Sequence, residues 1–170
     1  YGCSSLRTIT LPESVTSIGS YAFERCTNLA DITIPKSVTE IGTSVFSKTL
    51  WLENRQAENP LVTVNGILID GKTCLGEVII PDNVIAVNNG AFHNCDKITS
   101  VEIPESVAEI GYDAFYSCDN LESITIENPE CKIYDLETTI SNTYIYGYRE
   151  SIPWFDGMIC GYENSTAQAH

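Results

Sequence analysis

The stretch CTNLADITIPKSVTEIGTSVF, residues 26–46, is one copy of a phrase that recurs along the chain. It matches CSSLRTITLPESVTSIGSYAF at residues 3–23, and its opening matches CDNLESITI at residues 118–126. The cysteines that begin the first two copies, Cys3 and Cys26, lie 26 − 3 = 23 residues apart. Self-similarity at a fixed short period is typical of solenoid proteins, in which each repeat is one structural unit.

Apolar residues hold fixed positions within this period of 23 residues. The columns read Leu6, Leu29, Leu52, Leu75, Ile98 and Leu121; Ile9, Ile32, Arg55, Val78, Val101 and Ile124; Ile18, Ile41, Val64, Val87, Ile110 and Ile133; and Phe23, Phe46, Ile69, Phe92 and Phe115. The alternation I-x-I predicts a short strand with two apolar residues on one face. The proline that follows (Pro12, Pro35, Pro81 or Pro104) cannot donate to a strand ladder and ends the strand. Each repeat is therefore predicted to form one coil, which buries its apolar residues by stacking on its neighbours.

A second recurring position carries glycine or asparagine: Gly19, Gly42, Asn65, Asn88 and Gly111. These two residue types enter the left-handed backbone region most cheaply, so this position is predicted to have a positive φ. On that basis Gly42→Asn is expected to be much milder than Gly42→Val. The Ala-Phe pair that comes next is predicted to form a tight turn that drives the phenylalanine inward.

The phrase C-x-x-L-x-x-I-x-I-P-x-S-V-x-x-I-G-x-x-A-F resembles the BspA-like leucine-rich repeats of bacterial secreted and surface proteins. The match is close at residues 3–46 and 92–126 and weaker at 75–91. The resemblance implies an α/β solenoid, a right-handed coil with a parallel sheet on its concave side, and no single activity. We expect a single domain, with the solenoid over residues 1–126 and a C-terminal capping segment over 127–170.

Residues 48–72 depart from the pattern, because Arg55 and Ala57 occupy strand-core positions. TLWLENRQAE predicts a short amphipathic helix with Trp51, Leu52 and Ala57 inward. Asn65-Gly66 between two apolar alternations predicts a β-hairpin. This helix and hairpin replace one regular coil, either as an irregular packing unit or as a ligand-facing feature.

The capping segment is rich in aromatic residues. An open solenoid end has to be covered, and bulky side chains serve that purpose. Alternatively, Tyr146, Tyr148 and Trp154 form a platform on which a sugar stacks. A disulfide between Cys131 and Cys160 in this segment is neither required nor excluded by the spacing.

The recurring cysteines Cys3, Cys26, Cys95 and Cys118 raise the alternatives of disulfides, a metal site, a catalytic thiol and a structural position in the coil wall. Stacked side chains point the same way, which disfavours a bridge between neighbouring coils. The two pairs are three coils apart, on the order of 14 Å, which is too far for one four-cysteine zinc site. A thiol nucleophile needs a nearby base, and the chain has two histidines. We therefore expect buried, free, structural thiols.

Composition excludes several classes of partner. With 9 basic and 23 acidic residues the net charge is −14, which disfavours nucleic acid and anionic membrane surfaces, and no apolar run suits membrane insertion. No phosphate-binding loop, zinc-protease or serine-hydrolase motif is present in the sequence. We expect no enzymatic activity, no cofactor and no metal site.

The outward positions of the predicted strands carry small hydroxyls and interspersed acids. They are either a binding surface or simply the polar exterior that any exposed sheet needs. If this face binds, the residues that confer specificity are Arg7, Asp31, Glu77, Glu102 and Glu122.

The leading hypothesis is a non-catalytic recognition or adhesion module that binds a protein or a cell-wall or matrix ligand through the solenoid face. The alternatives are a polysaccharide-binding module that uses the C-terminal aromatics, and a structural spacer of a multimodular, cellulosomal protein. The resemblance implies an extracellular or cell-surface location. Residue 1 falls inside a repeat, so we expect a fragment of a longer protein, in which flanking sequence could supply dockerin–cohesin attachment.

Overall fold

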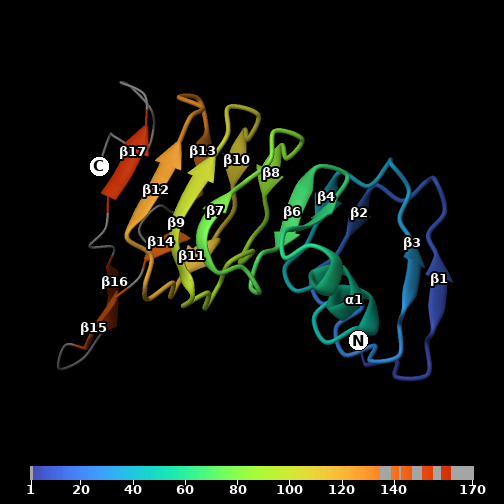
Figure 1. Cartoon of the computed structure of the whole chain (residues 1–170). Helices are drawn as coiled ribbons and strands as arrows, with labels where there is room; N and C mark the ends of the chain where they lie inside the picture. The colour runs from blue at the N-terminus through green and yellow to red at the C-terminus, as the bar shows by residue number, and fades with distance from the viewer. Residues whose placement is uncertain (1, 135–138, 142, 147–150, 155–157, 162–170) are drawn as a thin grey trace.

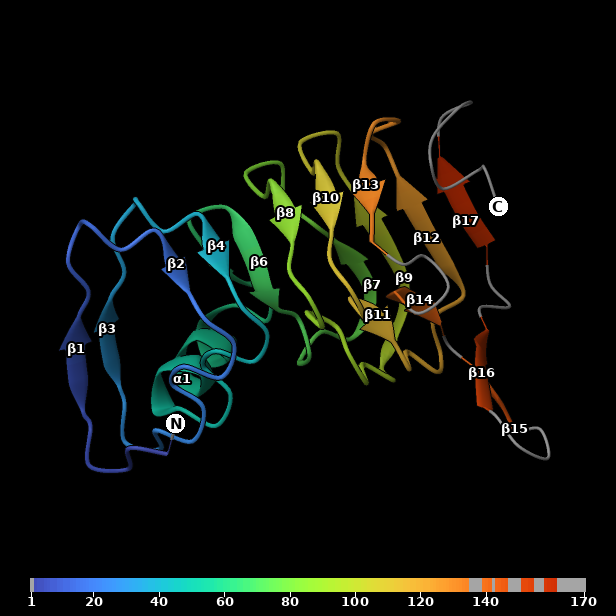
Figure 2. The ribbon, with the colours of Figure 1, turned by 180° about the vertical axis from the view of Figure 1, so that it is seen from behind.

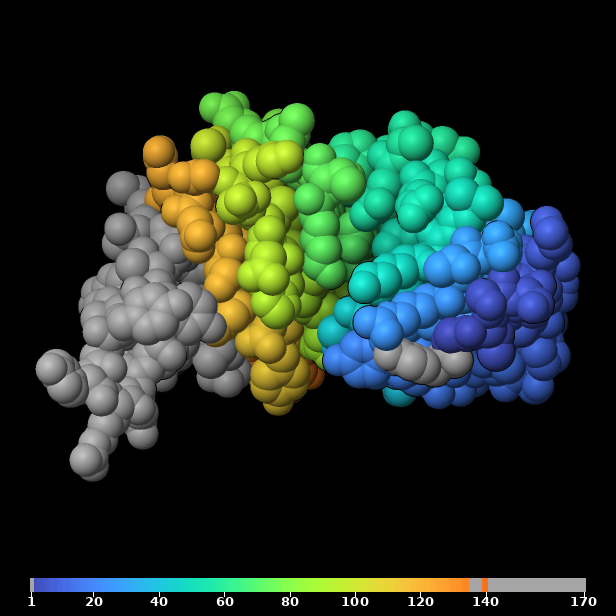
Figure 3. Space-filling view, turned by 90° about the horizontal axis from the view of Figure 1, so that it is seen from below, coloured from blue at the N-terminus to red at the C-terminus, as the bar shows by residue number. Residues whose placement is uncertain are grey.

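The computed structural model describes residues 2–134, 139–141, 143–146, 151–154 and 158–161, with side chains for residues 2–134 and 139–140. The repeats form successive coils that stack from β1 at one end to β17 at the other (Figure 1). In the space-filling view the coils follow one another as bands across the molecule (Figure 3). The predicted solenoid fold is confirmed.

A regular coil contributes two strands, and equivalent strands of successive coils run parallel to each other. The L-x-x-I-x-I segments and one later strand, β17, form what we call the first ladder: β1 (Thr8–Thr10), β3 (Asp31–Thr33), β7 (Gly76–Ile79), β9 (Ile98–Ile103), β12 (Ser123–Ile126) and β17 (Met158–Gly161). The V-x-x-I segments form the second ladder, which lies in a row in Figure 2: β2 (Ser17–Ile18), β4 (Glu40–Ile41), β6 (Ile67–Asp70), β8 (Ala86–Val87), β10 (Glu109–Ile110) and β13 (Lys132–Ile133). The other elements are α1 (Leu50–Glu58), β5 (Val62–Val64), β11 (Phe115–Tyr116), β14 (Ile140–Ser141), β15 (Thr143–Tyr146) and β16 (Ser151–Trp154).

Strand register reproduces the sequence period. Ile9 pairs with Ile32, and Val101 with Ile124, in both cases 23 residues apart. The last pairing differs, because Ile124 pairs with Ile159, which is 159 − 124 = 35 residues further on. The antiparallel hairpin β15–β16 lies within this longer coil. Strand β17 thus continues the first ladder, and the boundary of a separate capping segment at residue 127 stays a prediction.

Recurring polar side chains tie each coil to the one before it. The hydroxyl of Ser37 donates to the carbonyl of Val15, and that of Ser106 donates to the carbonyl of Val84, both at 2.7 Å. Both serines follow the strand-ending proline by two residues. The P-x-S-V phrase therefore recurs because its serine satisfies a carbonyl of the preceding coil.

Both ladders are interrupted at the irregular unit. The first ladder divides into β1-β3 and β7-β9-β12-β17, and the second divides into β2-β4 and β5-β6-β8-β10-β13. The buried apolar residues likewise form two clusters, one built around Phe46 and Trp51 and the other around Phe92 and Phe115. The break in the stack is therefore a feature of the core as well as of the surface.

The predicted helix and hairpin are confirmed at this break. Trp51 and Leu52 are buried, but Ala57 is exposed, so the prediction that Ala57 points inward was wrong. The helix is only 9 residues long and leaves Ala57 near its solvent-facing C-terminal end. Asn65 and Gly66 have φ values of 50° and 83°, and they connect the antiparallel strands β5 and β6.

The predicted positive φ at the glycine position was wrong except at Asn65. The left-handed residues of the coils lie two and six positions later, for example at Ser44 and Lys48. Glycine is needed at Gly42 for a different reason: a Cβ there would lie 2.2 Å from the backbone nitrogen of Ser20 in the preceding coil. Asn88 holds the equivalent position in a later coil, where its side chain donates to the carbonyl of Gly42 at 3.2 Å.

One member of the leucine column also departs from its predicted place. Leu75 is 66% exposed, whereas the preceding residue, Cys74, is buried. Gly76 has a φ of 64°, and the β7–β9 register shifts between Gly76 and Glu77. This irregularity exchanges the inward and outward positions at the start of β7.

Candidate functional site

The outward face of the first ladder carries the residues predicted to bind a partner. Asp31 lies opposite Thr8 in the β1–β3 pair. Glu77 lies opposite Ser100, and Glu102 lies between Ile79 and Thr125. The predicted residues Arg7, Asp31, Glu77, Glu102 and Glu122 are all exposed. Their positions are therefore suited to contact a partner, although binding by these side chains stays a prediction.

The interruption of the ladder divides this predicted set. Glu77, Glu102 and Glu122 belong to the β7-β9-β12 part of the face, whereas Arg7 and Asp31 belong to the β1-β3 part. Helix α1 lies between the two parts (Figure 1). The structure therefore brings Glu77 and Glu102 together on one continuous sheet, with Glu122 directly before its strand β12.

The acids of this face have no ion-pair partner among the described residues. The ion pairs in that part of the chain join Glu24 to Arg25, Arg55 to Glu58, and Asp70 to Lys72. None of them uses Asp31, Glu77, Glu102 or Glu122. The carboxylates of the first ladder therefore present uncompensated negative charge to solvent.

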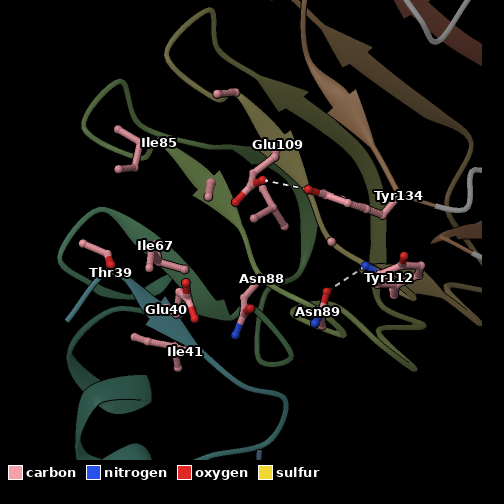
Figure 4. A pocket seen from close by; sticks show the side chains of 14 residues that line it. Thr39, Glu40, Ile41, Ile67, Ile85, Asn88, Asn89, Glu109, Tyr112 and Tyr134 are labelled. Atoms are coloured by element: carbon pink, nitrogen blue, oxygen red, sulfur yellow. Dashed lines mark hydrogen bonds between the residues drawn. The ribbon is translucent and has the colours of Figure 1, made fainter. Parts of the chain in front are cut away.

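The second ladder carries a groove of about 440 Å³, which we call the tyrosine groove. Its lining includes Glu40, Ile85, Asn89, Glu109, Tyr112 and Tyr134. Figure 4 shows apolar side chains, including Ile41, Ile67 and Ile85, toward one side and Glu109, Tyr112 and Tyr134 toward the other. The groove follows the break in the stack, since β4 and β8 both line it but belong to different sheets.

Hydrogen bonds hold the polar side of the groove in place. The Tyr134 hydroxyl donates to Glu109 Oε2 at 3.4 Å and accepts from Lys132 Nζ at 2.9 Å. The hydrogen bond between Lys132 and the Tyr134 hydroxyl is the main reason why the pKa of Lys132 is raised. The Tyr112 and Tyr134 rings lie 5.3 Å apart, and the side chain of Asn89 accepts from the backbone of Tyr112 at 2.8 Å.

The two groove tyrosines were missed at the level of sequence. Tyr134 stands 23 residues after Gly111, in the position that carries glycine or asparagine in every earlier repeat. A bulky aromatic at that position was the available signal. Tyr112 is 51% exposed, so its ring is accessible to a ligand.

Three of the four recurring cysteines are buried, as predicted. Cys26, Cys95 and Cys118 are buried free thiols, but Cys3 is exposed, so the prediction of burial was wrong for Cys3. The Cys118 thiol donates to the carbonyl of Phe92 at 3.1 Å, and the Cys95 thiol donates to the carbonyl of Gly71 at 3.6 Å. Each of these thiols thus satisfies a carbonyl in the preceding coil.

The acid–base properties of these thiols do not favour nucleophilic catalysis. Burial is the main cause that raises the pKa of Cys118 to about 12 and that of Cys95 to about 11. A nucleophilic cysteine needs a lowered pKa, because the thiolate is the reactive form. His93 has a pKa lowered chiefly by burial, and its ring meets Tyr116 edge-on at 5.2 Å.

Within the described part of the chain, no group of three or more His, Cys, Asp or Glu residues is placed to hold a metal ion. The helix in that part is too short and polar to cross a bilayer. Of the predicted sugar platform, Tyr146 and Trp154 lie on β15 and β16, where side chains are not described, and Tyr148 lies outside the described residues.

A family model described as the BspA type leucine-rich repeat region matches residues 1–66 and 70–145 in six copies. A search of curated proteins gave no match. Among solved structures, the chain is similar to a leucine-rich repeat protein of T. pallidum, with 27% identity, a TM-score of 0.34, and coverage of 80% of this chain and 59% of that one. It is also similar to a leucine-rich repeat protein of Bacteroides ovatus, with 19% identity, a TM-score of 0.35, and coverage of 98% of this chain and 36% of that one. A third similar structure is the pneumococcal vaccine antigen PcpA, with 20% identity, a TM-score of 0.38, and coverage of 72% of this chain and 42% of that one. The chain thus spans between about a third and three fifths of the length of these proteins.

Proposed function

The chain belongs to the BspA-type leucine-rich repeat family, and from this premise we propose that it is a non-catalytic recognition module of a secreted or cell-surface protein. In this proposal the first ladder binds a protein partner that presents basic side chains. Solenoids suit such a role because stacked coils form an extended, rigid surface on which side chains are held at fixed spacing.

One observation carries the proposal: the outward acids of the first ladder are exposed and have no ion-pair partner within the described residues. An exposed carboxylate contributes little to the stability of its own fold. Its negative charge does attract a basic surface and directs the encounter between two proteins. The net charge of −14 extends that attraction beyond the ladder itself.

The test replaces Asp31, Glu77 and Glu102 with alanine in one variant. The wild-type chain is first used to capture proteins from a solubilised extracellular-matrix preparation, and the captured protein is purified. Its association with the triple variant is expected to be about tenfold slower at low salt, with a weaker salt dependence. A replacement of Glu53 and Glu58, which are exposed on α1, serves as the control that removes charge elsewhere. Equal association rates for wild type and triple variant would refute the proposal.

A second function, saccharide binding, is favoured by the tyrosine groove. Aromatic faces and convergent carboxylate and amide groups in a groove are typical of small-ligand sites. The groove places Tyr112 and Tyr134 beside Glu109 and Asn89. The test is calorimetry with oligosaccharides released from plant cell wall.

If a saccharide binds in the groove, Tyr112→Ala should weaken binding about tenfold or more, as is typical of a truncated tyrosine anchor. Tyr21 offers a matched control, because it is 49% exposed on another coil and does not line the groove. Equal losses in Tyr112→Ala and Tyr21→Ala would count against the groove as the binding site.

A further inference from the structure

Strand β7 is an open edge of the first ladder. It pairs with β9 on one side and is the terminal strand of the sheet β7-β9-β12-β17. In the repeat register the strand on its other side would begin 23 residues before Glu77, at Asn54, which lies within α1. The helix has therefore removed the strand that would have covered this edge.

The main-chain groups of β7 show which residues face the opening. The N–H of Gly76 donates to the carbonyl of Lys97, and the N–H of Ile80 donates to the carbonyl of Glu102, so these two residues face β9. Successive residues of a strand direct their N–H and C=O groups to opposite sides. The groups of Glu77 and Ile79 therefore point toward the open edge.

Residues 59–61 line a hollow together with β7 but do not supply the missing pairing. The N–H of Asn59 donates to the carbonyl of Arg55 at 2.8 Å, and that of Leu61 donates to the side chain of Asn59 at 2.9 Å. Pro60 has no N–H. The donors of this segment are thus engaged elsewhere or missing, and a hollow of about 160 Å³ remains between it and β7.

The side chains along this edge are unusually apolar for an exposed strand. Leu75 and Ile79 are 66% and 68% exposed, whereas the other exposed large hydrophobic side chains of the described residues reach at most 53%. Both line the hollow. Open edges are normally protected by charge, proline or extreme shortness, and an unprotected apolar edge is a template for pairing with another strand.

We propose that β7 is a docking edge to which an extended segment of a protein partner adds as a further strand. The N–H and C=O groups of Glu77 and Ile79 have no backbone partner in the described part of the chain. They require an occupant with a polypeptide backbone, and the hollow accepts one of its apolar side chains. Glu77 and the net charge of −14 select a segment in which basic residues alternate with apolar ones, and they disfavour a second copy of this chain. This inference rests on the proposed function as a protein-recognition module and names its binding mode.

The first measurement is amide hydrogen exchange of the free chain. The amides of Glu77 and Ile79 should exchange much faster than that of Val78, which faces β9. Strong protection of Glu77 and Ile79 in the free chain would overturn the inference, because the edge would then already be paired.

The second measurement uses a defined probe, a peptide of about eight residues that alternates valine and lysine, long enough for one strand. Binding should protect the amides of Glu77 and Ile79. The control peptide has the same composition but is N-methylated at successive central amides, so that neither of its edges can pair. It is expected to bind at least about tenfold more weakly, since main-chain hydrogen bonds supply the affinity of an added strand. Equal binding of the two peptides would show charge attraction without strand pairing and would refute the proposal.

Side-chain variants separate this inference from the proposed function. The double variant Leu75→Ser/Ile79→Thr should keep its fold and lose peptide binding by about tenfold or more, because it removes the apolar contacts of the edge. Ile85→Thr is the matched control, since Ile85 is 53% exposed but lines the tyrosine groove. If the captured matrix protein is lost from the acid triple variant but still binds Leu75→Ser/Ile79→Thr, the docking edge is wrong and the proposed function stands. A dimer of the wild-type chain that Ile79→Lys dissolves would also overturn the choice of a foreign partner.

Discussion

Replacement of Gly42 by alanine tests how closely the coils stack. The added Cβ would lie 2.2 Å from the backbone nitrogen of Ser20 and 2.6 Å from its Cα, where an ordinary contact needs at least 3.4 Å. The two coils must therefore separate locally by about 3.4 − 2.2 = 1.2 Å. The obstacle is backbone, which cannot rotate away as a side chain could.

The magnitude follows from the hydrogen bonds that this separation stretches. Gly42 donates to the carbonyl of Ile18 at 2.8 Å, and Tyr21 donates to the carbonyl of Thr43 at 3.0 Å. Adding 1.2 Å to either distance breaks the bond, and each bond contributes about 1 kcal/mol. With the two bonds lost and an overpacking cost of about 1–3 kcal/mol, the free energy of unfolding should fall by about 3–5 kcal/mol. For a chain of this size that corresponds to a melting temperature lower by roughly 6–20 °C.

Gly19→Ala is the matched control, because the equivalent Cβ in the first coil would have no atom within 4 Å and the φ of Gly19 is not positive. It should leave stability unchanged or raise it by about 0.5 kcal/mol, through the lower entropy of the unfolded chain. Urea unfolding monitored by circular dichroism measures both variants. Gly42→Asn should be as harmful as Gly42→Ala, which reverses the expectation from sequence. Similar stabilities for Gly42→Ala and Gly19→Ala would refute the close-approach explanation.

Three further predictions concern buried polar groups. In the native protein Cys3 should react with a thiol reagent within the mixing time, whereas Cys26, Cys95 and Cys118 should react only as the fold opens. Mass mapping of the labelled protein identifies the cysteines that have reacted, and rapid labelling of all four would contradict the burial of the last three. The pKa values of Cys95 and Cys118 are raised in the folded state from 9.0 to about 11 and about 12. The unfolded state therefore loses these protons first, and the free energy of unfolding should decline as the pH rises above about 9. A Cys118→Ala variant should show a shallower decline with pH. An unchanged slope in that variant would contradict the contribution of Cys118. Thr49→Ala should lower stability by about 1–2 kcal/mol in thermal unfolding, because the buried Thr49 hydroxyl donates to the carbonyl of Phe46 and caps α1 by accepting from the backbone N–H of Leu52. Thr49→Ser should retain most of that stability. Equal losses in the two variants would contradict the capping role.

Much of the fold could be read from the repeat period. Because a solenoid places residues one period apart on top of each other, the columns that contain Ile32, Val101 and Ile110 could be assigned to the core from their spacing alone. The hairpin at Asn65-Gly66 was equally accessible, since its turn chemistry is local. The burial of Cys26, Cys95 and Cys118 was recognised from the period, although the carbonyls to which Cys95 and Cys118 donate lie in another coil.

The candidate site was only partly accessible from sequence. The exposed acids of the first ladder follow from strand alternation, so Glu77 and Glu102 were placed on the correct face. The tyrosine groove was missed because its walls come from coils that the irregular unit holds apart. Tyr112 and Tyr134 come from different coils, and their rings lie side by side only once the coils have stacked.

The sequence by itself determined the period, the stacking, the two strands of a regular coil and the position of the break. All of these depend on interactions within one repeat or between residues one period apart. Only the tertiary structure decided why Gly42 must be glycine, why Leu75 faces solvent in place of Cys74, and that β7 is left with an open edge. Those features depend on how closely two backbones approach and on what α1 leaves uncovered, which are properties of neighbouring coils and not of any one segment.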